Sequence, residues 1–213
     1  MKSAMPYRGH TAAELTRLLR PILADPTVRP ATRAEWERAV RILWHGATHR
    51  EDRYAAQHLA GHRAYRSWQD PDTLDLYREL IIDGAWWDHV DTLAAHRVGD
   101  ILHSHREPTT AVLRQWMVAD DLWLRRTAII SQLGHGPDTD LDLLSDAIDA
   151  NLDASASSGT PATAYGREFF IRKAIGWALR QYARTDPDWV RAFVDSRGDR
   201  LSGLSRREAL KHL

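Results

Sequence analysis

The sequence has no cysteine and no long apolar run, and each absence excludes whole classes of protein. Without cysteine there can be no disulfide framework, no thiol nucleophile and no thiolate metal site. No stretch approaches the roughly 20 consecutive apolar residues that a membrane-spanning helix needs. The chain also lacks a basic start followed by an apolar core and a small-residue cleavage site, the pattern of a secretory signal. We therefore expect a globular, cytoplasmic protein.

Lysine is scarce, because only Lys2, Lys173 and Lys211 accompany the many arginines. The formal net charge is zero, but the charges are unevenly distributed along the chain. Residues 1–50 carry a net charge of +5 and residues 165–213 also +5, whereas residues 51–135 carry −4 and residues 136–164 carry −6. Basic ends allow part of the surface to contact a nucleic acid, but charge distribution alone does not establish such contact.

Strand signals are nearly absent, and helix signals recur throughout the chain. No Asn-Gly or Gly-Gly turn separates alternating apolar runs. Three capping boxes are predicted, at Thr32–Glu35, Thr48–Glu51 and Ser205–Glu208. The expected helices cover residues 11–20, 32–46, 50–66, 71–82, 86–104, 108–118, 121–134, 140–152, 166–184, 187–196 and 205–213.

This pattern predicts an all-α fold in a single domain over residues 1–213. Short loops between many helices favour stacked helical hairpins, and helix pairs repeating about every 40 residues fit a HEAT-like solenoid. A plain helical bundle is the competing fold. The one low-complexity stretch, "NLDASASSGTPATAYG" at 151–166, is expected to be a mobile polar loop.

An acid stands out on the apolar face of one predicted helix. In "GAWWDHVDTLAAHRVGDIL" a single helical stripe contains Trp87, Val90, Ala94, Val98, Ile101 and Leu102. Asp91 falls in the same stripe, one turn after Trp87. A carboxylate in apolar surroundings is costly unless a partner pairs with it or a function uses it. Asp91 is therefore either a structural ion-pair residue or a site residue.

An arginine stands out in the same way in "DLWLRRTAIISQL". Leu122, Ile129, Ile130 and Leu133 form the expected inward stripe. Arg126 falls between Leu122 and Ile129, and Arg125 lies beside the stripe. The structural interpretation is that Arg126 neutralises an acid such as Asp91. The functional interpretation is that it presents its guanidinium to a phosphate.

Trp177 lies on a basic helix face in "REFFIRKAIGWALRQYARTDPDWV". It follows Lys173 by four residues and precedes Arg180 by three. An aromatic ring among cations suits contact with a nucleic acid. The alternative is a partly exposed tryptophan at a contact between helices.

Several familiar chemistries have no support. The histidine pairs His45 with His49 and His58 with His62 have helical spacing but lack the glutamate of the zinc-hydrolase motif. Gly134 and Gly136 in "LGHGPD" resemble a helix stop rather than a phosphate-binding loop. No Gly-x-Ser-x-Gly sequence occurs. We expect no metal and no cofactor.

Four ordered segments, "WWDHVD", "WLRRTAII", "REFFIRKAIGWALRQYARTDPDWV" and "LSGLSRREALKHL", resemble motifs of the AlkD-type DNA alkylation-repair glycosylases. "MKSAMPYRGH" resembles that family's N-terminal Met-Lys-x-x-(Phe/Met)-Pro-(Phe/Tyr)-x-Gly segment. The resemblance covers essentially the whole chain. We expect three departures from the family pattern. The chain begins at the Met-Lys segment, so the family's first helix is expected to be missing; His10 stands where the pattern usually has an aliphatic residue; and the loop at 151–166 is expected to be longer than usual.

The resemblance implies a right-handed solenoid of HEAT-like repeats whose concave basic face holds duplex DNA. Carried over by motif, the catalytic residues are Trp87, Asp91, Arg126 and Trp177. The DNA-binding residues expected with them are Arg125, Arg126, Lys173, Arg180, Arg206 and Lys211. The implied activity is excision of cationic N3- or N7-alkylated purines, such as 7-methylguanine and 3-methyladenine, and of bulky adducts, without a base-flipping pocket. We expect a monomer, associated with the nucleoid when it is bound to DNA.

Two other functions are compatible with the sequence. A non-catalytic relative would bind bent or branched DNA without releasing a base. A helical-repeat adaptor would bind proteins, as many solenoids do, and its best support is the neutral net charge. Service in general repair and self-resistance to a DNA-alkylating natural product are not distinguished by the sequence.

Overall fold

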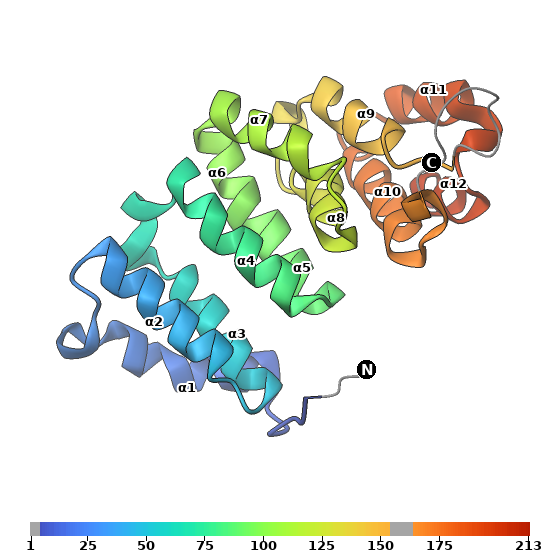
Figure 1. Cartoon of the computed structure of the whole chain (residues 1–213). Helices are drawn as coiled ribbons and strands as arrows, with labels where there is room; N and C mark the ends of the chain where they lie inside the picture. Colours follow the sequence, from blue (N-terminus) through green and yellow to red (C-terminus); the bar gives the residue numbers. More distant parts are fainter. Residues whose placement is uncertain (1–4, 154–163) are drawn as a thin grey trace. The chain divides into compact units, whose positions relative to one another are not determined.

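The computed structural model describes residues 5–153 and 164–213, and over these ranges the chain is helical and contains no strand. The all-α prediction is confirmed. The α-helices in chain order are α1 (Ala12–Ala24), α2 (Arg33–His45), α3 (Arg50–Ala60), α4 (Leu74–Gly84), α5 (Trp87–Leu93), α6 (Gly99–Ser104), α7 (Arg106–Trp116), α8 (Leu122–Ile130), α9 (Leu141–Asp149), α10 (Phe169–Tyr182), α11 (Pro187–Arg197) and α12 (Gly203–Ala209) (Figure 1). No helix in the described ranges is both long and apolar enough to cross a membrane.

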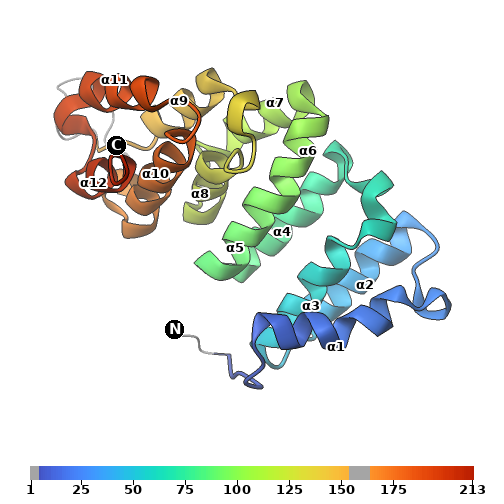
Figure 2. The same cartoon turned by 180° about the vertical axis from the view of Figure 1, so that it is seen from behind.

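The chain divides into two compact units, Met1–Gln69 and Asp70–Leu213. Within each unit, helices contact the next helix in the sequence or the next but one: α2 packs on α3 and α7 on α8, while α1 packs on α3 and α10 on both α8 and α12 (Figures 1 and 2). This packing of neighbours is consistent with a helical-repeat solenoid. The handedness of the solenoid and its concave face stay predictions.

The first unit is built from α1, α2 and α3 around two buried tryptophans. Trp36 and Trp44 of α2 are completely buried, because they repeat on one face of that helix. The Trp36 indole N–H donates to the Leu59 carbonyl at 3.3 Å. Its ring also contacts Tyr65, which stacks on Trp68 with ring centroids 5.2 Å apart. Aromatic packing therefore closes the end of this unit.

Glu51 fixes the N-terminal segment to α3. Its carboxylate accepts the backbone N–H groups of Arg8, Gly9 and His10 at 2.9 to 3.2 Å. Glu51 was predicted to complete a capping box with Thr48, and that prediction is wrong. His49 is the N-cap instead, and Asp52 occupies the third helical position and accepts the His49 N–H. The predicted box at Thr32–Glu35 is confirmed.

The second unit is organised around α8. Every residue from Trp123 to Gln132 is buried, because α4, α5, α7, α9 and α10 all contact this helix. The arginines Arg125 and Arg126 are buried with the rest. A charged side chain in this position needs partners inside the protein.

The helix expected over 86–104 has a π-helical turn, Ala94–Val98, inserted between α5 and α6. Gly99 follows this turn, and a Cβ atom there would lie 2.4 Å from the Ser131 carbonyl oxygen. Close approach of α8 therefore requires a glycine at this position. The π turn shifts the side chains before it relative to those after it, and such turns are frequent at functional sites.

Other helix ends differ from the sequence prediction for local reasons. α1 continues through Pro21 to Ala24, because a proline near the end of an exposed helix removes only one hydrogen bond. The helix expected over 50–66 ends at Ala60, and a separate 3₁₀ segment covers Arg63–Trp68. α12 is capped by Ser202, so the predicted Ser205–Glu208 box is wrong.

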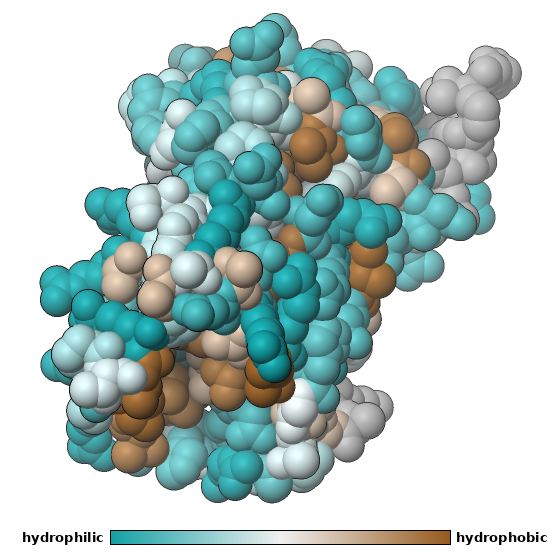
Figure 3. Space-filling view, turned by 60° about the vertical axis from the view of Figure 1, so that its left-hand side comes forward, coloured by the Kyte–Doolittle hydropathy of each residue, from teal (hydrophilic) through white to brown (hydrophobic). Residues whose placement is uncertain are grey.

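The surface is mostly hydrophilic, with several apolar areas among the charged residues (Figure 3). The most exposed large apolar side chains include Ile22 and Val28 in the first unit. Most of the loop predicted at 151–166 lies outside the described residues. Its two described ends meet: Arg167 contacts Asp153 at 3.0 Å, and Gly166 lies against the backbone of Leu152.

Candidate functional site

Asp91 of α5 and Arg126 of α8 form a closed ion pair. The Arg126 Nε and Nη2 atoms donate to the two Asp91 carboxylate oxygens at 2.7 and 2.9 Å. The Asp91 side chain keeps 15% of its surface exposed and Arg126 keeps 5%. The structural interpretation of Arg126, as the partner of Asp91, is therefore confirmed. A bidentate pair of this kind fixes both groups in direction as well as in distance.

Burial dominates the electrostatics of the acid. Desolvation raises the pKa of Asp91 above the ordinary value for aspartic acid, and the hydrogen bonds and charge of Arg126 only partly oppose this effect. The nearby carboxylate of Asp88 raises the pKa slightly further. Asp91 is thus an acid whose charge depends on its arginine partner.

Arg126 is held from a second side by α10. Its Nη1 donates to the Phe170 carbonyl at 2.5 Å, and its guanidinium lies 6.0 Å from the centre of the Phe170 ring. A guanidinium has five N–H donors. Asp91 and Phe170 accept three of them, and no described residue accepts the other two. Arg126 thus keeps two N–H groups without a described acceptor, on a side chain of which 5% is exposed.

Trp87 lies beside the pair on the surface of α5. It precedes Asp91 by four residues, so the two side chains occupy the same helix face. The sequence placed Trp87 in the buried stripe, but the structure leaves 39% of it exposed. Val90, Ala94 and Val98 of that stripe are buried as expected. Trp87 is therefore exposed although it shares a helix face with Asp91, and its neighbour in the chain packs against other aromatic rings.

That neighbour is Trp86, which packs into an aromatic cluster with Trp123 and Phe170. The Trp86 and Phe170 ring centres are 5.6 Å apart, and those of Trp123 and Phe170 are 5.0 Å apart. The cluster joins the start of α5 to α8 and α10. It therefore sets the position of Trp87 and Asp91 relative to Arg126. No role was predicted for Trp86 from the sequence, although a second aromatic residue directly before Trp87 in "AWWD" was an available signal.

Trp177 lies seven residues after Phe170 on α10 and is partly exposed. The preceding Gly176 allows α12 to approach closely, since a Cβ atom there would lie 2.5 Å from the Cβ of Glu208. Glu208 consequently lies between the two cations predicted to bind DNA. It contacts Lys173 at 2.9 Å and also pairs with Arg180.

The other predicted DNA contacts are distributed differently. Arg125 is buried and donates to the carbonyls of Met117, Val118 and Ala119 and to the Asn151 side chain, so it caps the end of α7. These bonds turn its donors into the protein, and the arrangement does not favour the predicted DNA contact. Arg206 donates to the Gly198 carbonyl at 3.1 Å, and Lys211 is exposed near the C-terminus. Within the described residues no group of three or more side chains is arranged to hold a metal ion.

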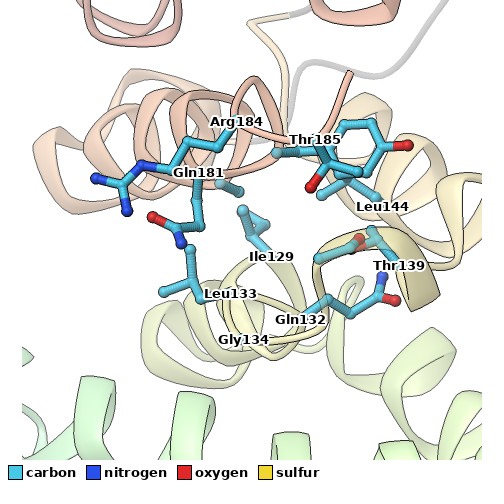
Figure 4. A pocket seen from close by; sticks show the side chains of 12 residues that line it. Ile129, Gln132, Leu133, Gly134, Thr139, Leu144, Gln181, Arg184 and Thr185 are labelled. Carbon is cyan, nitrogen blue, oxygen red and sulfur yellow. The ribbon is translucent and has the colours of Figure 1, made fainter. Parts of the chain in front are cut away.

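A small cavity of about 140 Å³ lies between the ends of α8 and α10 and the start of α9 (Figure 4). Ile129, Leu144 and Ala178 contribute apolar walls. Gln181 and Thr185 contribute polar side chains. This cavity was not predicted from the sequence, because its lining residues come from separate segments that only the packing of α8, α9 and α10 brings together.

These features define an all-helical protein that presents an arginine-bound acid next to an exposed tryptophan. The model of the family described as DNA alkylation repair enzyme matches residues 1–213, and the chain belongs to that family. A solved structure described as a predicted DNA alkylation repair enzyme from Enterococcus faecalis is similar, with 28% identity and a TM-score of 0.82. The match covers 98% of this chain and 89% of that one. No curated protein matches the chain. Family membership supports an enzymatic role in DNA repair.

Proposed function

We propose that the protein is a DNA glycosylase that hydrolyses the N-glycosidic bond of N3- or N7-alkylated purines in duplex DNA. The observation that carries this proposal is the Asp91–Arg126 pair next to the half-exposed ring of Trp87. Family membership supports it at the level of DNA alkylation repair.

Alkylation at N3 or N7 makes the purine cationic, so the base is already a good leaving group. As the bond breaks, the deoxyribose acquires positive, oxocarbenium-like character, as in glycoside hydrolysis. An ionised Asp91 stabilises that charge where it develops and can orient the attacking water. Each Asp91 oxygen accepts one bond from Arg126 and keeps a further lone pair for this purpose.

The arginine has a separate role in this proposal. Its two remaining N–H groups bind a phosphate next to the lesion and fix the strand relative to Asp91. Because Arg126 keeps its bonds to Asp91 and Phe170, the phosphate is bound at a constant distance from the acid. Opening the ion pair is therefore not required.

Trp87 and Trp177 provide ring faces for the sugar. The negative face of an aromatic ring attracts a developing cation. This scheme uses contacts to the backbone of the lesion and no pocket for an extruded base. It favours cationic lesions over neutral ones, and it tolerates bulky adducts because nothing encloses the base.

The test is base release from a duplex containing one 7-methylguanine, measured under single-turnover conditions. Asp91→Asn should reduce the rate by about 100-fold or more, the usual loss when one electrostatic group is removed from a reacting centre. Asp100→Asn is the matched control, since Asp100 lies on α6 and its side chain is 68% exposed. Full activity of Asp91→Asn, with an unchanged circular dichroism spectrum, would remove Asp91 from the mechanism.

Base release, measured together with DNA binding by the same wild-type protein, distinguishes the rival functions. Tight binding of duplex or branched DNA without base release by the wild-type protein would identify a DNA-binding relative. Absence of any salt-sensitive DNA binding would favour a protein-binding adaptor.

A further inference from the structure

The face of α10 that carries Trp177 continues towards the C-terminal end of the helix. Gln181 follows Trp177 by four residues, so it lies on the same side of the helix about 6 Å further along the axis. Arg184 follows in the turn after α10, two residues beyond the last residue of the helix. Both residues line the cavity between α8, α9 and α10.

Arg184 differs from the other cations of this face. Lys173 and Arg180 are engaged by Glu208. Arg184 is exposed, and it makes no ion pair with any residue in the described part of the chain. No acid among the described residues therefore neutralises its charge.

The cavity next to Arg184 combines two kinds of surface. Gln181 and Thr185 offer an amide and a hydroxyl that bond to no other residue among those described. Figure 4 shows the Gln181 and Arg184 side chains extending to the same side of the cavity. Ile129 and Leu144 form an apolar floor. The apolar floor suits the carbon atoms of a sugar, and the polar and cationic groups beside it suit an attached phosphate.

The size of the cavity limits its ligand. Its volume of about 140 Å³ is less than half of the roughly 300 Å³ at which pockets for drug-sized ligands begin. A single ring fits such a space, but a complete nucleotide does not. The phosphate of the ligand must therefore remain at the rim, where Arg184 lies.

We infer that Arg184, Gln181 and the adjoining cavity form a second DNA-backbone subsite, for an undamaged nucleotide of the lesion strand. Its phosphate binds Arg184 and Gln181, and its deoxyribose contacts the apolar floor. This inference rests on the proposed function. Because Trp177 lies within α10 and Arg184 lies beyond its C-terminal end, the subsite takes a nucleotide further along the strand than the lesion.

The test uses the full chain and duplexes that carry a stable tetrahydrofuran abasic site in place of the lesion. The duplexes are shortened stepwise from either side of that site, and binding is measured by fluorescence anisotropy. For wild type, one removal step on one side of the abasic site should weaken binding several-fold, whereas the matching step on the other side should have little effect. Arg184→Gln should bind the long duplex as weakly as wild type binds the shortened one, and its salt slope should fall by about one phosphate contact.

Arg191→Gln is the matched control, because Arg191 is an exposed arginine of α11 that pairs with Asp188 at 2.8 Å. It should behave as wild type. If Arg184→Gln responds to shortening as wild type does, the subsite is wrong. A deoxynucleoside monophosphate that raises the melting temperature of wild type but not of Arg184→Gln, without any dependence on duplex length, would identify a free-nucleotide site instead.

The outcomes also separate this inference from the proposed function. If wild type releases no base but Arg184 still determines the length dependence, the glycosylase proposal fails and the subsite stands. If wild type releases the base and Arg184→Gln shows the wild-type length profile, only the subsite fails.

Discussion

Asp91 and Arg126 meet through two parallel hydrogen bonds although 35 residues separate them in the chain. The pair joins α5 to α8, and the Phe170 carbonyl holds the same guanidinium from α10. Three helices thus determine the position of one carboxylate. Replacing Arg126 would remove the hydrogen bonds and the charge that favour the ionised form of Asp91.

The pH dependence of base release should follow the ionisation of Asp91. Because burial raises the pKa of this carboxyl, the rate should fall as the pH decreases through a value above 3.8, the ordinary value for aspartic acid. The rate falls at low pH because only the ionised carboxylate stabilises the positive charge that develops on the sugar. Single-turnover rates across the acid range measure it, and a rate that stays constant down to the ordinary pKa of aspartic acid would contradict it.

The same raised pKa has an opposite effect on folding. A folded-state pKa above the unfolded value means that protonation of Asp91 favours the folded state. The contribution of this group to the free energy of unfolding is therefore present at low pH and is lost as the pH rises through the folded pKa. Activity and this part of the stability should change in opposite directions with pH.

Removing Arg126 should destabilise the fold. Arg126→Ala leaves Asp91 buried without its partner, and breaking a buried pair in this way costs about 3 kcal/mol. Chemical denaturation of the variant measures the loss. Arg191→Ala provides the comparison, because an exposed pair contributes only about 0 to 1 kcal/mol. Equal effects of the two substitutions would show that the Asp91–Arg126 pair is not part of the folding core.

Glu208 should limit the affinity of the protein for DNA. It engages Lys173 and Arg180, and its hydrogen bond to Lys173 holds the pKa of the carboxyl below its ordinary value. It is therefore ionised at neutral pH and opposes phosphate binding. Glu208→Gln should bind undamaged duplex several-fold more tightly at low salt, and the difference should shrink as screening increases.

Binding of undamaged duplex as a function of salt checks this expectation. Glu168→Gln is the control, since Glu168 is an exposed acid at the start of α10, the helix that carries Lys173 and Arg180. Weaker binding by Glu208→Gln would show that the acid positions the two cations for DNA instead of competing with it.

The sequence by itself determined the helical class and most helix positions, because these depend on local signals. The capping box at Thr32–Glu35 and the apolar spacing of Val90, Ala94 and Val98 specify their helices without help from distant residues. It also singled out Asp91 and Arg126, since a charge at an apolar helical position is visible from spacing alone.

Only the tertiary structure decided how those charges are used. Spacing along one helix cannot show that Arg126 reaches Asp91 and Phe170, because both partners belong to other helices. For the same reason the sequence did not predict that Arg125 donates hydrogen bonds to the end of α7. It also did not predict that Glu208, expected in a capping box, pairs with Lys173. Helix formation is a local balance of backbone hydrogen bonds and side-chain packing, whereas the pairing of charges depends on which helices the core brings together.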